Sequence, residues 1–329
     1  MSLSQNFSKT PAEARQKFLA ACAAANIDTN PFQCPATIPA GAGKNQTEDA
    51  DQFWWIDVAR LGSPDASRVV VLCCGLNGAE GYCGSGVLVS WLAEKRQQEL
   101  PRDVAVVLVH GVNPGPLIDT GGAAGATPAG PRETKSIETA PPPRGWTDKV
   151  LAAAERRFME YARKNSTATN AATKSQSANI WVEKIFESIG AIVTKKATHA
   201  ALLEFHTNLS ESSEVSIYSC HKAGSTHDER IAEWFGPNSG TQSDGPAIAD
   251  ALLLNLERVL DGADLTAMVV EFGVYSTRSV LAIDPPKNTA DRRKRYQHLF
   301  YPESPAWREN AALEARSIIR RVAQGMEAL

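Results

Sequence analysis

Residues 69–86, VVVLCCGLNGAEGYCGSG, decide the fold of this chain. The apolar run at 69–74 predicts a strand that is buried on both faces, which is typical of a parallel sheet covered by helices. The strand ends in a glycine-rich loop, and glycine lets a backbone turn tightly and approach a bound group. Within the loop stand one carboxylate, Glu80, and one amide, Asn77. This arrangement indicates a ligand site at the carboxyl edge of an α/β sheet.

Further apolar runs alternate with helical patterns along the chain. Strands are predicted at 53–58, 104–109, 200–205, 214–218 and 267–270, and helices at 11–25, 87–99, 147–164, 180–189, 246–260 and 306–329. This alternation predicts an α/β fold with a mixed, largely parallel sheet between helices. We find no internal repeat and no domain boundary, so residues 1–329 are predicted to form a single domain. A long Gly/Pro-rich loop at about 115–145 interrupts it.

Composition excludes several classes of function. The chain has 329 residues and a formal net charge of -3, which does not favour nucleic acid or an anionic membrane as a partner. No apolar run reaches the length of a membrane span, and the first residues lack the pattern of a signal peptide. Six cysteines without paired metal-binding spacing indicate a reducing compartment. We therefore expect a cytoplasmic protein that acts on a small molecule or peptide.

Polar side chains follow several of the predicted strands. His206 ends the strand at 200–205, Glu271 ends the strand at 267–270, and Glu80 follows the strand at 69–74. A His and a Glu from separate strand ends can bind zinc while a second Glu acts as general base. Each residue also has a structural interpretation, because a lone Glu can cap a loop and a lone His can be a buried core residue. Glu271 favours function most, since a buried carboxylate is costly unless paired or bound to metal.

A set of short motifs resembles the zinc carboxypeptidase superfamily, specifically a branch described only as a domain of unknown function. The resemblance runs nearly end to end. Its motifs are Phe7-Ser8, Ala12-Glu13-Ala14-Arg15, Asp57-Val58-Ala59-Arg60-Leu61-Gly62, Gly78-Ala79-Glu80-Gly81-Tyr82, Gly84-Ser85-Gly86, His110-Gly111-Val112-Asn113-Pro114, Glu204-Phe205-His206-Thr207, Glu271-Phe272-Gly273, Tyr301-Pro302 and Trp307-Arg308.

The resemblance implies an eight-stranded mixed sheet with one zinc ion at the strand ends. It implies Glu80 and His206 as metal ligands and Glu271 as the carboxylate that activates water. The family has a His as first ligand, where this chain has Asn77, and an amide oxygen is a much poorer zinc donor than imidazole. The metal site is therefore predicted to be altered.

The expected substrate site also departs from the family. The arginine-rich stretch that grips a substrate carboxylate is absent, and the Gly/Pro-rich loop in its place carries only Arg132 and Arg144. His110 and Asn113 are predicted to line the substrate pocket, because they end a strand beside the metal loop. His110 is equally compatible with a structural role.

Three functions follow. The first is a zinc-dependent hydrolase of amide or peptide bonds, carboxypeptidase-like or deacylase-like, with an altered metal site. The second is a catalytically impaired pseudoenzyme that binds a ligand or partner in the same pocket. The third is a cysteine hydrolase using Cys83 or Cys220 with His221, which adjacency in sequence does not support, because neighbouring side chains point in different directions.

Overall fold

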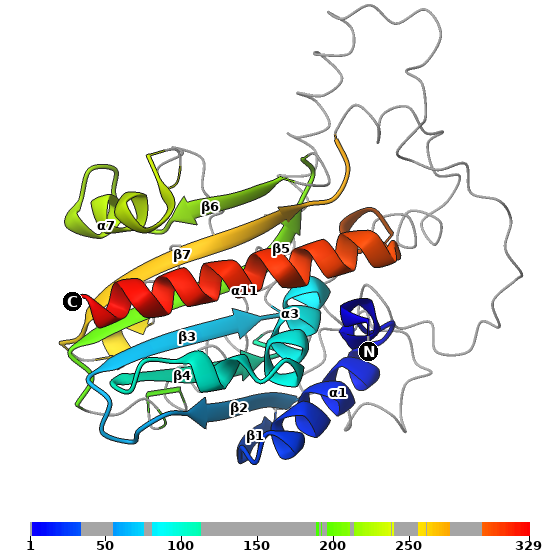
Figure 1. Cartoon of the computed structure of the whole chain (residues 1–329), viewed down its shortest axis with the longest axis horizontal. Helices are drawn as coiled ribbons and strands as arrows, with labels where there is room; N and C mark the ends of the chain where they lie inside the picture. The colour runs from blue at the N-terminus through cyan, green and yellow to red at the C-terminus, as the bar shows by residue number, and fades with distance from the viewer. Residues whose placement is uncertain are drawn as a thin grey trace, which may run out of the picture.

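A computed structural model gives the fold of the chain (Figure 1). It describes residues 2–33, 55–75, 81–112, 189–190, 192, 196–210, 214–237, 239, 256–260, 262–276 and 298–329. These residues form a seven-stranded sheet in the order β1-β2-β4-β3-β5-β7-β6. The mixed, largely parallel sheet flanked by helices confirms the predicted fold class.

Four central strands are parallel, and the strands toward both edges are antiparallel. The parallel strands are β3 (Arg68–Cys74), β4 (Val104–His110), β5 (His199–Asn208) and β7 (Asp264–Gly273). The antiparallel strands are β1 (Thr29–Gln33), β2 (Trp55–Leu61) and β6 (Val215–Ser219). The carboxyl ends of the four parallel strands therefore meet at one edge of the sheet.

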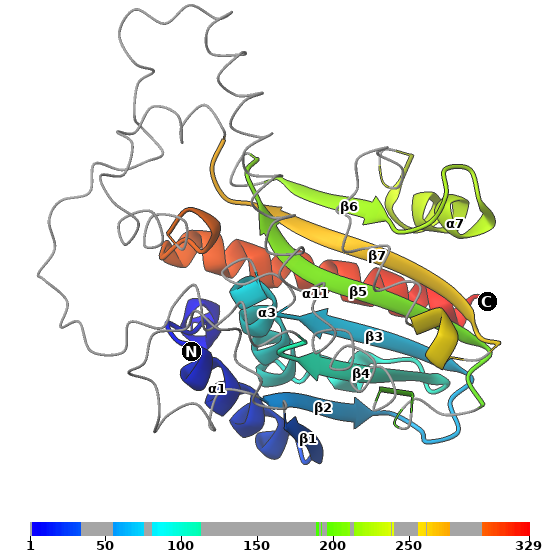
Figure 2. The same cartoon turned by 180° about the vertical axis from the view of Figure 1, so that it is seen from behind.

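One face of the sheet is covered by α1 (Pro11–Ala24), α3 (Gly81–Ala93) and α11 (Pro305–Glu327), as Figures 1 and 2 show from opposite sides. Helix α3 packs very closely, because a Cβ at Gly84 would lie 2.5 Å from the Cys74 Cβ and 3.0 Å from the Phe205 carbonyl oxygen. Only glycine fits there. The helix follows directly after the predicted metal loop, so the close packing at Gly84 sets the position in space at which the loop joins the helix.

The alternation of side chains along each strand assigns every strand residue to a face. Phe205 of β5 and Val270 of β7 belong to the apolar cluster beneath α1, α3 and α11. Leu202 and Val269 belong to the cluster on the opposite face, with Leu256 and Leu260. Because successive strand residues point to opposite faces, Glu204, His206 and Glu271 lie on this second face, while His110 and Asp57 lie on the helical face.

Helix α1 begins as the sequence predicts and is tied to the sheet by a buried ion pair. The Thr10 side chain accepts a hydrogen bond from the Glu13 backbone N–H, and Pro11 is the first helical residue. Further along, the Arg15 guanidinium makes two hydrogen bonds to the fully buried Asp57 carboxylate, at 2.7 and 3.0 Å. Asp57 therefore holds α1 over β2.

Several element boundaries differ from the sequence prediction. Helix α3 begins at Gly81 rather than at 87 and ends at Ala93, followed by a short 3-10 helix at Arg96–Glu99. Strand β1 and helix α7 (Thr226–Phe235) were not predicted. The loop at 115–145, the helix predicted at 147–164 and most of that at 180–189 lie outside the described residues. Across the described ranges, every helix is too short or too polar to cross a membrane.

Candidate functional site

His206 joins two carboxylates at the carboxyl edge of the sheet. Its Nδ1 lies 2.5 Å from Oε2 of Glu204, which stands two residues earlier in β5 and therefore on the same face. Its Nε2 lies 2.8 Å from Oε1 of Glu271 in β7, and the two residues are register partners. The Asn208 side-chain amide donates to the other oxygen of Glu271, at 2.5 Å. The result is a hydrogen-bonded chain, Glu204–His206–Glu271–Asn208, in which the first three residues are buried and Asn208 is half-buried.

The two carboxylates control the charge of His206. Burial alone would lower its pKa, but the negative charges of Glu204 and Glu271 and their hydrogen bonds outweigh burial and raise the pKa well above its usual value. Glu204 is fully buried, and within the described part of the chain its Oε1 has no hydrogen-bond partner. Among the described residues, Glu204 hydrogen-bonds to His206 and fixes the orientation of the ring. The sequence analysis names Glu204 only as part of a motif and gives it no role, although residues two apart on a strand share a face.

One feature common to zinc-binding histidines is present at this edge, a carboxylate hydrogen-bonded to the ring of His206. A ligating imidazole commonly presents one nitrogen to the metal while the other bonds to a carboxylate, which is the relation of His206 to Glu204. Glu80, Asn77 and Asn113 lie outside the described residues, so their predicted roles stay predictions. Among the residues that are described, no group of three His, Cys, Asp or Glu side chains is placed to hold a metal.

His110 ends β4 at the same edge but on the helical face, away from the His206 side chain. Its ring stacks on Phe18 of α1 with centroids 4.6 Å apart, and its Nε2 lies 2.9 Å from the Ser85 hydroxyl of α3. The side chain is buried among these helices. These contacts give His110 a packing role under α1 and α3, and its predicted role in substrate binding stays a prediction.

His110 should make folding stability depend on pH. Burial lowers its pKa to about 4, with Asp57 opposing the shift and Arg15 adding to it. The ring is then neutral in the folded protein but titrates near 6.5 when unfolded, so stability is complete above about pH 6.5 and falls as the pH drops toward 4. The loss should approach about 3 kcal/mol. Urea unfolding of the wild type and His110→Gln across this range should show a flatter pH dependence in the variant. Equal slopes would contradict this account.

The two cysteines considered as nucleophiles, Cys83 and Cys220, both lie among the described residues and are buried. Burial raises the pKa of the Cys83 thiol well above its usual value, and the negative charge of Glu204 raises it further. His221 does not act as a base for Cys220, because its Nε2 accepts a hydrogen bond of 2.8 Å from the Ala267 backbone N–H. Since the thiolate is the reactive form, these environments oppose a cysteine hydrolase.

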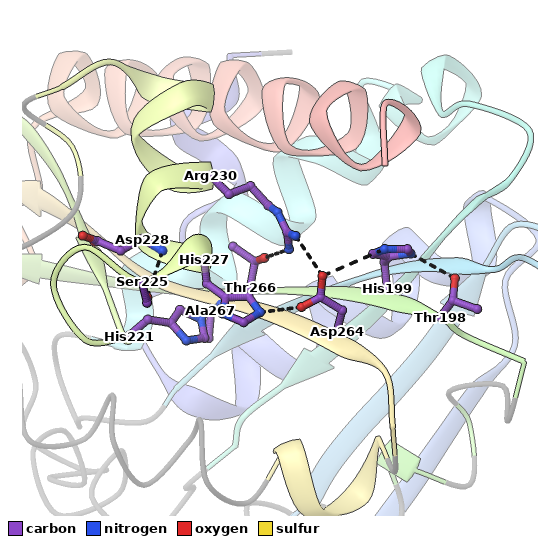
Figure 3. Close-up of polar contacts among 10 residues, drawn as sticks. All are labelled: Thr198, His199, His221, Ser225, His227, Asp228, Arg230, Asp264, Thr266 and Ala267. Atoms are coloured by element: carbon purple, nitrogen blue, oxygen red, sulfur yellow. Dashed lines mark hydrogen bonds and ion pairs between the residues drawn. The ribbon is translucent and has the colours of Figure 1, made fainter.

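A second polar cluster lies at the opposite edge of the sheet, where β5 and β7 begin (Figure 3). Arg230 of α7 donates to Asp264 at 2.8 Å and to Thr266 at 2.7 Å, and His227 bonds to the same Asp264 carboxylate. The His227 ring also stacks on His221, with centroids 4.6 Å apart. These contacts fasten α7 to the amino-terminal half of β7. We interpret this cluster as structural.

Comparison with known proteins gives a partial family match. Residues 7–115 match a family described as "Protein of unknown function (DUF2817)", which covers about a third of the chain. This segment contains β2, β3 and β4 and the predicted metal loop, and it ends before His206 and Glu271. No curated protein matches the sequence.

Solved structures resemble the chain over most of its length at low sequence identity. LapB from Legionella pneumophila has a TM-score of 0.44 and 8% identity, and the alignment covers 98% of this chain and 69% of LapB. The LapA aminopeptidase of the same organism has a TM-score of 0.40 and 9% identity, covering 97% and 68%. A glutaminyl cyclase from Fimbriiglobus ruber has a TM-score of 0.40 and 12% identity, covering 97% and 91%. At such scores the activity has to be argued from this chain's own residues.

Proposed function

We propose that the protein is a zinc-dependent hydrolase of amide or peptide bonds, with its reaction centre at His206 and Glu271. The observation that carries this proposal is the buried chain of Glu204, His206 and Glu271, joined at 2.5 and 2.8 Å. Burying two carboxylates and an imidazole together costs several kcal/mol unless each is paired, and a buried group with a strongly perturbed pKa and specific charged partners is a candidate for a functional site.

In this proposal each residue of the chain has a separate role in hydrolysis. Glu271 would take a proton from an attacking water and deliver it to the leaving nitrogen, acting first as general base and then as general acid. Asn208 donates to one oxygen of Glu271 and orients the carboxylate. Glu204 hydrogen-bonds to Nδ1 of His206 and so fixes the ring with its Nε2 facing the proposed reaction centre. The small-molecule or peptide substrate would enter from the carboxyl edge of the sheet.

The cofactor that we propose for these residues is one zinc ion. His206 would hold it, with Glu80 and Asn77 as the further ligands that the resemblance implies. When bound, zinc supplies a Lewis acid that polarises the carbonyl and lowers the pKa of a water to about 7. In the structure Nε2 of His206 is bonded directly to Glu271. Glu271 must leave this bond for His206 to bind metal.

The proposal is tested with protein purified without chelator and then supplemented with zinc. Bound zinc at about one equivalent, together with zinc-dependent hydrolysis of some members of a panel of N-acylated amino acids and short peptides, is the expected result. Removing the metal with chelator should abolish turnover, and adding zinc back should restore it. Protein that retains no divalent ion after supplementation would overturn the proposal.

A second function is favoured by the residue at position 77. Asn77 weakens the predicted metal loop, and the missing arginine stretch removes the expected grip on a substrate carboxylate. With both changes, the pocket would bind a ligand or partner without turnover. The same panel separates the two functions, because measurable metal-dependent hydrolysis removes this one.

Replacing Asn77 with His should restore the missing zinc donor. If Glu80 and His206 converge on one ion, Asn77→His should raise zinc affinity at least about tenfold, roughly 1.4 kcal/mol, and increase the thermal stabilisation that zinc gives. Isothermal titration calorimetry with ZnCl₂ measures the change, and Asn77→Gln is the matched control. Unchanged affinity would mean that Glu80 and His206 are not ligands of one ion.

A further inference from the structure

Four buried polar side chains meet where α1, α3 and α11 begin, on the helical face of the sheet. They are Ser8 just before α1, Tyr82 in the first turn of α3, Tyr301, and Arg308 in the first turn of α11. The Arg308 guanidinium carbon lies 4.9 Å from the centre of the Tyr301 ring. The Tyr82 and Tyr301 ring centres are 5.3 Å apart. Three separate segments therefore contribute to one cluster, which we call the Arg308 cluster.

The polar groups of the Arg308 cluster have few partners among the described residues. Within these ranges, the hydroxyls of Ser8 and Tyr82 are buried without a hydrogen-bond partner, and the backbone N–H of Ser8 approaches the hydroxyl of Tyr301. Arg308 is only 8% exposed, and its Nε donates to the Pro302 carbonyl oxygen at 3.0 Å. No carboxylate in the described part of the chain forms an ion pair with it. A buried cation without an anion and buried hydroxyls without partners are both costly.

Two aromatic rings partly compensate the positive charge of Arg308. The guanidinium lies over the Tyr301 ring and, at 5.8 Å, over the Phe7 ring. A ring face attracts a cation, but it offers no acceptor oxygen for the guanidinium N–H groups. All four members of the cluster can donate hydrogen bonds, and an Arg is suited to two parallel bonds to an oxyanion. A bound group with several acceptor oxygens could accept hydrogen bonds from all four side chains.

We propose that the Arg308 cluster is a binding site for a small oxyanion, the carboxylate or phosphate group of a ligand. Arg308 supplies the charge, and the Ser8, Tyr82 and Tyr301 hydroxyls supply donors. The beginning of the long helix α11 adds the favourable field of its backbone N–H groups, although that field alone would not make a site.

The site is separate from the His206–Glu271 pair but mechanically joined to it. It lies on the opposite face of the sheet. The Thr207 hydroxyl, next to His206, donates to the Phe300 carbonyl oxygen at 2.6 Å. Trp307 donates through Nε1 to the carbonyl oxygen of Gly273, two residues after Glu271, at 2.7 Å. An anion held by Arg308 and Tyr301 would therefore stabilise the segment that braces both catalytic strands.

Inorganic phosphate and acetate serve as the probes, each compared with sodium chloride at equal ionic strength. One or both should raise the melting temperature of the full-length protein and give a saturable calorimetric isotherm. A phosphate response without an acetate response identifies a phosphate ligand, and the reverse identifies a carboxylate. If neither probe acts beyond chloride, the proposal is overturned.

Two variants tie the effect to the cluster. Arg308→Gln should weaken binding of the effective anion at least about tenfold, because it removes the charge. Tyr82→Phe should weaken binding a few-fold and should not lower the melting temperature without anion, because no described group hydrogen-bonds to the lost hydroxyl. Arg320→Gln, at an exposed position of α11, is the control and should bind as the wild type does. Tyr82→Phe that binds the anion with unchanged affinity and melts at a lower temperature would show that the hydroxyl is structural and would overturn the assignment.

Discussion

Replacing Glu271 with Gln is expected to lower turnover by at least about a hundredfold, the usual cost of losing a general acid and base. The substitution keeps the size of the side chain and leaves an oxygen for the Asn208 amide, which bonds to Glu271 at 2.5 Å. Fold and zinc content should therefore stay near those of the wild type. Steady-state kinetics on the best substrate, with zinc measured by mass spectrometry on the same samples, separates the loss of chemistry from the loss of metal.

Glu303→Gln, at an exposed position shortly before α11, is a suitable control for the Glu271 variant. It removes a carboxylate outside the site and should leave turnover unchanged. Full activity in Glu271→Gln would contradict the role of Glu271 as the base. Another group would then have to accept the proton of the attacking water.

Replacing Glu204 with Gln is expected to lower zinc affinity and turnover by about ten- to a hundredfold, the range typical for a carboxylate behind a metal-bound His. Glu204 does not reach the reacting atoms, since His206 stands between it and Glu271. In the proposed site it acts as a positioning residue, and its negative charge raises the pKa of the imidazole. A purely structural residue would affect the melting temperature without a specific change in zinc affinity.

The Glu204 experiment therefore measures zinc affinity at a temperature at which the variant is fully folded. Glu94→Gln offers a matched control, because Glu94 pairs with Arg316 away from the sheet edge. Zinc affinity should fall only in the Glu204 variant. If both variants bind zinc as tightly as the wild type does, Glu204 has no part in positioning His206.

The central strands could be predicted well because they are apolar on both faces. Strand β3 was predicted at 69–74 and spans Arg68–Cys74, and β4 was predicted at 104–109 and spans Val104–His110. Because both faces are apolar, the sequence pattern does not show which face of the sheet each strand residue points to. Every residue of β4 is buried, so the pattern could not tell that His110 points toward α1 while His206 points to the other side. Pairing between strands, which is a long-range property, decides this.

The start of α3 shows how tertiary packing overrides local propensity. The glycines between 81 and 86 predict a loop, because glycine is a poor helix former. The structure needs small residues there, because α3 lies against β3 and β5 at Gly84 and against the Phe7 ring at Gly86. Close approach to the sheet therefore places glycines inside a helix. Helix α7 was missed for a related reason, since polar contacts to Asp264 and Thr266 help to hold it in place.

Of the site, the sequence could supply His206 and Glu271 but not their connection. Both end predicted strands, and only the register of β5 and β7 makes them partners. Glu204 could have been found from its spacing, since residues two apart on a strand share a face. In the stretch LLEFH at residues 202–206, however, the surrounding apolar residues make Glu204 look like part of a buried strand with no special role. A buried acid beside a His on one strand face is the signal to look for.

Zinc binding at His206 can be seen directly in an anomalous difference map from crystals of the zinc-supplemented protein, measured above and below the zinc absorption edge. We expect one peak beside Nε2 of His206, present only above the edge, with Glu271 no longer hydrogen-bonded to that nitrogen. A map without a peak at His206, or with His206 still bonded to Glu271 and zinc bound elsewhere, would contradict the proposed zinc site.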